Sequence, residues 1–479
     1  MRRQWLSLVR GKASPGTLLA DRRWLYLALG CWSAVWFVVL AHRGGIDWKF
    51  FTTGTSLLFG GHPTVIQGIT GGAGTAGPAG LPGPPPPGGL HIFASYPALQ
   101  MGPLAYLVTG LVRQLGPDNG LVAAELLLQA TGLAIVYLIE QIALKARPAL
   151  ARQGRAFSLT LLTGGAVFMV AWSELAAGFA HLDDGLALLL ATLAVFFWGV
   201  ETTPSLRPGV ARRYGLTLPG GPFGSSTAGR PRSELRSPRG LRGQWPAVGA
   251  GVCVGLAADA KPWALVFLPI VLIPAASCKN LRATAIAALA AAITLAVAWL
   301  PFFIADPGTL HATRFLIRNE PNSALRALGV TQNYTPNWDR PAQILLGCGL
   351  GVIAIARGRW PAVLLLAGGA RILLDPAAHS YYTPDILVGA LLWDLLGGST
   401  RRPLPVWTSV SFAALNLAPL AISDAQAQGA IRLALIAAFT ATTLLAPARA
   451  AKDKNYATGS PPRQTRLGAS PYDQTNAPS

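Results

Sequence analysis

The feature that most constrains this chain is a series of apolar runs separated by short polar or basic connections. Hydrophobic residues make up 52% of the 479 positions, and charged residues only 12%. A run of about 20 apolar residues is long enough for a helix to cross a bilayer, and many runs here approach that length. The sequence therefore predicts an all-α fold, a polytopic bundle of transmembrane helices.

We expect about twelve spans. Their predicted ranges are 24–41, 119–144, 157–178, 185–200, 246–259, 262–277, 283–304, 342–356, 360–374, 382–397, 405–422 and 429–447.

The basic residues predict how these spans are oriented. Clusters occur before the first span, at 145–155, 207–242, 279–282, 357–359 and 401–402, and after 447, and they hold most of the 39 Lys and Arg residues. Because cytoplasmic loops collect Lys and Arg, we expect these connections and both termini to be cytoplasmic, in a multi-pass protein of the cell membrane. This topology requires that 97–113 does not cross, so we expect an interfacial helix there, on the outer surface.

Three segments are too rich in Gly, Pro, Ser or Arg to bury a core. We expect a flexible insertion at 71–89 within the long first outer loop, a disordered basic cytoplasmic loop at 201–245, and a disordered cytoplasmic tail at 448–479. Residues 1–447 then form one transmembrane domain. The net charge of +19 fits basic loops that meet anionic lipid, so no nucleic-acid partner is expected.

Acidic residues emerge at the outer face in this topology. Asp47 follows the first span, and His181, Asp183 and Asp184 occupy the short outer turn between the third and fourth spans. A carboxylate at this position can act as a general base. The alternative interpretations are a solvated loop residue for Asp47 and a helix N-cap for Asp183 and Asp184.

Basic residues face the same side. Lys261 separates two runs too short to cover the ~30 Å apolar core, Arg371 lies inside an apolar span, and Arg314 and Arg318 belong to the outer loop 305–340. Lys261 could instead snorkel to the interface, and the two loop arginines could be solvated. Intramembrane ionisable residues usually serve function, and together these cations suit the binding of a phosphate leaving group.

Several short motifs are similar to those of a known family. The segments Ile46–Phe51 and Leu57–Pro63, followed by Ser95–Leu99, resemble the first-loop motif of GT-C glycosyltransferases, in particular the actinobacterial polyprenyl-phosphate-mannose-dependent branch. Lys261–Leu265 and Leu374–Tyr382 also resemble segments of that family. The family's usual Tyr-Pro-Pro is Tyr-Pro-Ala in this chain, and the turn at 181–184 is unusually acidic for it.

The resemblance implies a GT-C-like catalytic domain with its active site outside. The expected reaction transfers mannose or arabinose, with inversion, from a polyprenyl-phosphate-linked donor to a glycan, glycolipid or protein acceptor of the cell envelope. Asp47 would be the general base and His181, Asp183 and Asp184 a second acidic or acceptor site. Lys261, Arg371, Arg314 and Arg318 would bind the donor phosphate. Tyr96, His379, Tyr381 and Tyr382 would contact the acceptor or sugar.

Two other function classes stay open: a secondary transporter or flippase for an envelope precursor, and a non-catalytic scaffold. Transporters usually divide into two repeated halves, and no such repeat is evident here. No cofactor is expected, since the donor is lipid-linked. The four cysteines show no metal-ligand spacing. A divalent ion at Asp183 and Asp184 is not favoured, because no third ligand is evident at short spacing.

Overall fold

The computed structural model describes residues 22–60, 87–97, 99–199, 244–278, 280–314, 316–397 and 403–445. Within these ranges all regular secondary structure is helical, apart from one isolated bridge between Arg318 and Tyr334. The predicted all-α fold is therefore confirmed. The expectations for the insertion at 71–89, the basic loop at 201–245 and the tail at 448–479 fall almost entirely outside the described residues.

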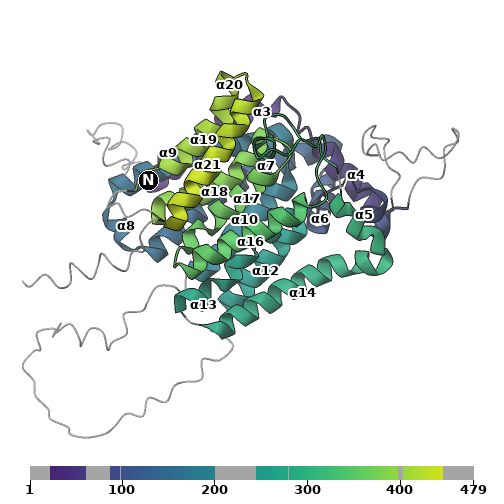
Figure 1. Cartoon of the computed structure of the whole chain (residues 1–479), viewed down its shortest axis with the longest axis horizontal. Helices are drawn as coiled ribbons and strands as arrows, with labels where there is room; N and C mark the ends of the chain where they lie inside the picture. The colour runs from purple at the N-terminus through teal and green to yellow at the C-terminus, as the bar shows by residue number, and fades with distance from the viewer. Residues whose placement is uncertain are drawn as a thin grey trace, which may run out of the picture. The chain divides into compact units, whose positions relative to one another are not determined.

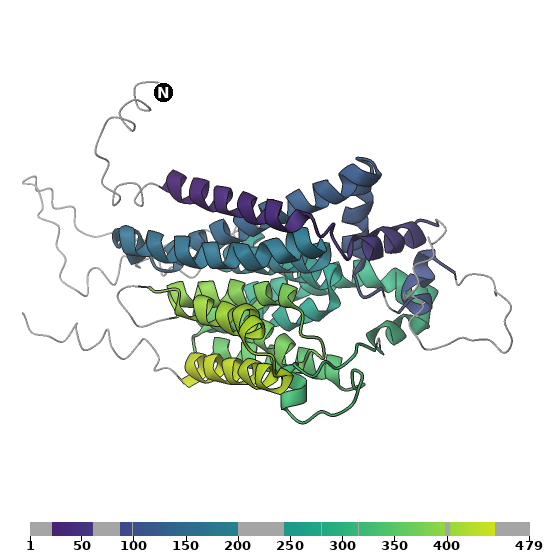
Figure 2. The same ribbon diagram turned by 90° about the horizontal axis from the view of Figure 1, so that it is seen from above.

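The elements follow one another as a series of helices (Figures 1 and 2). The first part of the chain contains α3 (Arg22–Ala41), α4 (Trp48–Leu58), η1 (Gly89–His91), α5 (Ile92–Ser95), α6 (Pro103–Arg113), α7 (Pro117–Ala146), α8 (Ala149–Arg152), α9 (Arg155–Ser173), η2 (Glu174–Phe179) and α10 (Leu182–Gly199). The middle contains α12 (Trp245–Ala260), η4 (Pro262–Leu272), α13 (Ile273–Cys278), α14 (Leu281–Ala305), η5 (Pro307–Arg314) and α15 (Ala324–Ala327). The last part contains α16 (Asp339–Ala356), η6 (Trp360–Ala362), α17 (Val363–Leu374), η7 (Ser380–Tyr382), α18 (Thr383–Leu396), α19 (Val406–Phe412), η8 (Ala413–Leu417), α20 (Ala418–Ala421) and α21 (Ala425–Leu445).

Each predicted span coincides with helical structure. Six helices are long and apolar enough to cross a membrane: Arg22–Ala41, Asn119–Ala146, Arg155–Phe179, Leu281–Ala305, Asp339–Ala356 and Ala425–Leu445. Four shorter apolar helices also coincide with predicted spans: Trp245–Ala260, Pro262–Ala276, Trp360–Leu374 and Val406–Ala421. These helices are compatible with a membrane protein, while the number twelve stays a prediction.

Helix α18 is enclosed by the rest of the bundle. All of its residues are buried, and it packs against α7, α9, α17 and α19. Polar side chains on α18 are consequently shielded from solvent and need partners from the neighbouring helices.

Small residues let α12 and α14 pack closely. Gly251 and Gly255 are four residues apart on α12, and a Cβ atom at either position would overlap the backbone carbonyl of Ala287 or Ala291 on α14. This small-xxx-small spacing allows two helix backbones to approach each other. It anchors α12, whose C-terminal end carries Lys261.

Two described residues of the basic clusters, Arg22 and Arg147, lie at one end of the bundle. Arg22 at the start of α3 pairs with Glu140 near the end of α7 at 3.2 Å. Arg147, which follows α7, donates to the carbonyl of Leu395 at the end of α18 at 3.5 Å. Helices α4, α5 and α6 lie at the other end (Figures 1 and 2). Arg22 and Arg147 thus lie at the end of the bundle opposite Asp47.

Helix α6 is too short to cross a bilayer. It has 11 residues, or about 16 Å at 1.5 Å per residue. Just before it, the Gly102 amide donates to the Ala260 carbonyl at 2.9 Å, and Arg113 at its C-terminal end donates to Ser56 of α4 at 2.8 Å. Both ends of α6 are therefore held at the Asp47 end of the bundle, as the charge pattern requires.

We expect the turn between α8 and α9 to be cytoplasmic. Ala151 of α8 is exposed just before that turn, so a cysteine introduced there, in a background without the native cysteines, should resist an impermeant thiol reagent in intact cells. Arg318→Cys at the opposite end should react and serves as the control. Rapid labelling of Ala151→Cys together with protection of Arg318→Cys would reverse the orientation.

Candidate functional site

The candidate site lies where five segments meet at the Asp47 end of the bundle. They are the loop before α4, the η2–α10 turn, the break between α12 and η4, the C-terminal part of α17, and the segment that leads into α18. The charged side chains of these segments form a connected network of ion pairs.

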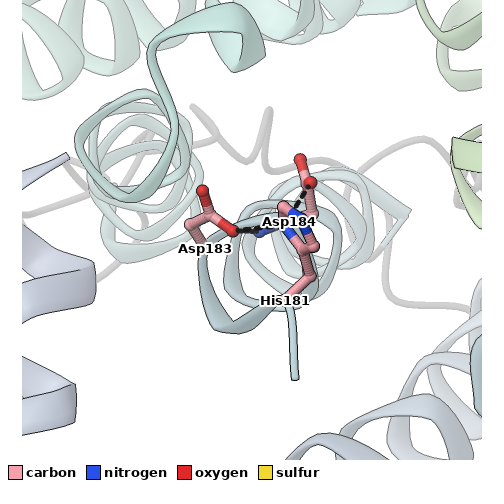
Figure 3. A group of neighbouring side chains, drawn as sticks. All are labelled: His181, Asp183 and Asp184. Atoms are coloured by element: carbon pink, nitrogen blue, oxygen red, sulfur yellow. Dashed lines mark hydrogen bonds and ion pairs between the residues drawn. The ribbon is translucent and has the colours of Figure 1, made fainter. Parts of the chain in front are cut away.

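His181 is the centre of that network. Its Nε2 atom lies 2.9 Å from Oδ2 of Asp47, and its Nδ1 atom lies 3.0 Å from Oδ1 of Asp183 and 3.1 Å from Oδ2 of Asp184. Figure 3 shows the three residues of this turn, with both carboxylates directed at the same ring edge. Nδ1 hydrogen-bonds Asp183, whereas Asp184 Oδ2 forms only the ion-pair contact. The imidazole thus connects the first outer loop to the start of α10.

An unusual backbone turn presents His181. Helix α9 widens into the π-helix η2, which ends at Ala180 in the left-handed conformation with φ 53°. A non-glycine residue in that region is strained, and π-helical turns often occur at functional sites. The amides of Ile46 and Asp47 donate to the carbonyls of Gly178 and Phe179, at 3.3 and 3.0 Å. The turn and the Asp47 loop therefore support each other.

Two cations support the carboxylates from other helices. Pro262 lacks an amide hydrogen and disfavours helical backbone in the residue before it. Accordingly α12 ends at Ala260, and Lys261 is extended with φ −145° and ψ 117°. The Lys261 ammonium donates to Asp183. Arg371 of α17 lies 3.1 Å from Asp184 and also pairs with Asp385 of α18.

Aromatic rings enclose the guanidinium of Arg371. Its central carbon lies 4.0 Å from the ring centroid of Trp263 and 4.3 Å from that of Tyr382. The Trp263 indole also donates to Asp184 at 2.6 Å. Cation–π contacts of this kind are strongest when desolvated, so they help to hold a charged group in this buried position.

A column of rings leads from the surface to His181. The exposed His379 ring lies 5.1 Å from the Tyr381 ring at 11°, and the Tyr381 ring lies 4.2 Å from the His181 ring at 23°. Tyr382 packs edge-on against Tyr381 at 4.6 Å. The predicted contact residues at 379–382 thus adjoin the charged network.

Asp47 differs from the other carboxylates in its exposure. Its side chain is 18% exposed, compared with 0% for Asp183 and 1% for Asp184. One oxygen contacts His181, and within the described part of the chain no partner binds the other. Asp47 is therefore the carboxylate of this network that can meet a substrate.

The carboxylates determine the charge of His181. Burial opposes protonation of the ring, but Asp183, Asp184 and Asp47 outweigh it and hold the pKa of His181 well above its ordinary value. These carboxylates therefore favour the protonated form of the ring. Burial, with Tyr382 and Asp47 nearby, also keeps the Tyr381 hydroxyl protonated by raising its pKa.

The predicted residues fall into two groups. The structure brings together Asp47, His181, Asp183, Asp184, Lys261, Arg371, His379, Tyr381 and Tyr382. Arg318 is exposed on the loop that bridges to Tyr334, and Tyr96 is buried where α5 ends. The side chain of Arg314 lies outside the described residues. Phosphate binding by Lys261, Arg371, Arg314 and Arg318 stays a prediction.

Sequence reasoning missed Asp385. This residue is fully enclosed on α18 and pairs with Arg371. The signal was available, since an acidic residue within an apolar span is a functional candidate in its own right. Its partner was not evident, because it depends on how α17 packs against α18.

The same turn offers a set of metal ligands. His181, Asp183 and Asp184 each present one ligand atom, all within 4.8 Å of one another, so His181 supplies the third ligand that spacing alone did not reveal. A divalent ion would have to replace the proton on His181 Nδ1, beside the positive charges of Lys261 and Arg371. Those charges disfavour a cation at this point.

Comparison with known proteins identifies no relative. No protein-family model matches the chain, and no curated protein or solved structure is significantly similar to it.

Loss of Lys261 should destabilise the fold. Lys261→Ala leaves Asp183 buried without its main cation, which typically costs ~3–5 kcal/mol. The purified variant should unfold at a lower temperature in detergent. Lys261→Met combined with Asp183→Asn removes both charges and should recover most of the loss. An unchanged unfolding temperature for Lys261→Ala would contradict a stabilising pair.

The protein should lose stability as the pH rises. Because the folded-state pKa of His181 is raised, its contribution is complete below the unfolded value of about 6.5 and is lost as the pH rises through the folded value. Thermal unfolding between pH 6 and 9 should show this decline. His181→Gln should flatten the profile, and an equally steep profile would exclude His181 as its source.

Proposed function

We propose that this protein is an integral membrane glycosyltransferase that moves a sugar from a polyprenyl-phosphate-linked donor to a cell-envelope glycan or glycolipid. The observation that carries the proposal is the partly exposed carboxylate of Asp47, held by the His181 ring at 2.9 Å in front of a buried charged network. The site lies at one end of a bundle of apolar helices, where a lipid-linked donor can present its head group.

Asp47 acts as the general base in this proposal. Oδ2 is held by His181, which leaves Oδ1 to accept the proton of an acceptor hydroxyl. The hydroxyl oxygen forms a bond to the anomeric carbon from the face opposite the phosphate. The bond from that carbon to the phosphate oxygen breaks, and the polyprenyl phosphate leaves with the electron pair. The transfer thereby inverts the anomeric configuration.

The buried network keeps Asp47 oriented. His181 holds Oδ2 of Asp47 at 2.9 Å. Asp183 and Asp184 contact Nδ1 on the other side of the ring and fix the position of the imidazole. Lys261 and Arg371 in turn keep these two carboxylates ionised in a buried position. In this proposal His181 is a positioning residue, and the cations behind it maintain its partners.

Asp47→Asn should abolish transfer without unfolding the protein. The amide keeps the size of the side chain but cannot take the proton, so the rate should fall by about 10²–10⁴-fold. The assay supplies purified protein with polyprenyl-phosphate-linked mannose or arabinose and follows sugar transfer.

Asp424→Asn provides the control, because this exposed aspartate caps α21 far along the chain from the network. It should transfer at the wild-type rate. Wild-type transfer by Asp47→Asn would exclude Asp47 as the base. If Asp183→Asn then abolished transfer in a folded protein, the base would belong to the η2–α10 turn.

A further inference from the structure

The cations of the buried network already have anionic partners. Three cations, His181, Lys261 and Arg371, face four carboxylates, those of Asp47, Asp183, Asp184 and Asp385. A phosphate brought among them would add negative charge to a network in which carboxylates already outnumber cations. The donor phosphate is more favourably held by cations that are near Asp47 and lack a carboxylate partner.

Helices α4 and α6 carry two such cations. Lys49 is exposed, two residues after Asp47, and its ammonium lies over the Phe50 ring, 5.5 Å from the centroid. Arg113 is exposed at the end of α6, and its NH1 atom donates to the Thr52 carbonyl at 3.1 Å and to the Ser56 hydroxyl at 2.8 Å. Among the described residues neither cation has an ion pair.

The two cations share one side of α4. Residues 49, 52 and 56 follow helical spacing, so their side chains lie along one face. Arg113 binds at positions 52 and 56 of that face, and Lys49 lies about one turn, or ~5 Å, nearer to Asp47. Neither helix contains an acidic residue. The hydroxyls of Thr52 and Ser56 donate to backbone carbonyls of α4, so Lys49 and Arg113 are the groups of this surface that can bind an anion.

An apolar stripe adjoins this surface. Leu107 and Leu111 are four residues apart on α6 and are 47% and 66% exposed, and Leu115 just beyond is 60% exposed. Phe59 at the end of α4 is 65% exposed. An amphipathic helix with an exposed apolar stripe and basic residues beside it is typical of a helix that lies in the membrane interface. Its polar edge is then at the level of lipid phosphates.

We propose that Lys49 and Arg113 bind the phosphate of a prenyl-linked donor, with its lipid chain along the Leu107–Leu115 stripe. This assignment rests on the proposed function and deepens it, because it places the leaving group beside the base. Cationic groups that hydrogen-bond a phosphate bind it strongly, and stabilising the departing charge promotes the reaction. Lys49 lies in the first turn of α4 and Asp47 is the N-cap of the same helix, so the phosphate would bind at the end of α4 that carries the base.

The test measures binding and does not depend on turnover. The full-length protein is placed in nanodiscs of neutral phosphatidylcholine, and its affinity for radiolabelled polyprenyl monophosphate is determined. Lys49→Gln and Arg113→Gln should each weaken binding by about 10–100-fold. Lys49→Arg should stay close to wild type. Arg282→Gln, which removes an exposed cation at the start of α14, is the matched control and should bind normally.

Competition distinguishes a prenyl-linked phosphate from other sources. Excess phosphatidylglycerol or inorganic phosphate should not displace the probe, and displacement by either would overturn the assignment. Wild-type affinity in both Lys49→Gln and Arg113→Gln would also overturn it. The Lys49 side chain makes no hydrogen bond within the described residues, so its variant remains informative if Arg113→Gln proves unstable.

The same assay separates this inference from the proposed function. Asp47→Asn should bind polyprenyl phosphate normally and fail to transfer sugar. If the Lys49 and Arg113 variants bind normally while Asp47→Asn still loses transfer, the phosphate site is refuted. The proposed glycosyltransferase function is then still supported. If the wild-type protein binds no polyprenyl phosphate, both the phosphate site and the proposed glycosyltransferase function are refuted.

Discussion

Burying Asp183 and Asp184 is the constraint on which the rest of this end of the molecule depends. Removing a carboxylate from water costs several kcal/mol, which only opposite charge and well-placed hydrogen bonds can offset. The required partners come from separate segments: Lys261 from the break after α12, and Arg371 from α17. Helices α10, α12 and α17 must therefore keep their rotation and their position along the bundle axis, because a shift of any of them would leave a buried charge unpaired.

In this arrangement the buried residues hold the site together, and a different residue, Asp47, is accessible. Three of the four carboxylates are fully enclosed and interact with cations, while Asp47 keeps one oxygen available and is partly exposed. The strained turn at Ala180 and the backbone bonds to the Asp47 loop hold that geometry. Rigid support of one accessible group by a buried network of ion pairs is how a protein preorganises a reactive side chain. Lys49 of α4 and Arg113 of α6 lie outside this network and form no ion pair among the described residues, which is why we propose them as ligands of an anion.

Much of the fold was predictable because hydropathy is a local property. The helices and the break at Pro262 both follow from residues close together in the chain. The π-helical turn at 174–179 could not be predicted, because nothing in its composition distinguishes it from a continuing α-helix. The pairing of Arg371 with Asp385 could not be predicted from the sequence either. It depends on Gly368, where a Cβ atom would overlap the Asp385 backbone, and such contacts between helices are not encoded in local periodicity.

By itself the sequence determined that the chain is helical, where its apolar segments lie, and which ionisable residues collect near their ends. Those properties follow from composition and spacing along the chain. Only the tertiary structure decided how the charges are used. Lys261 and Arg371, which looked like phosphate ligands, face carboxylates of neighbouring helices, whereas Lys49 and Arg113 face no acidic group in the described residues. The physical reason is that the rotation of each helix is set by its packing against others, and this rotation decides whether a cation meets an anion or remains free to bind one.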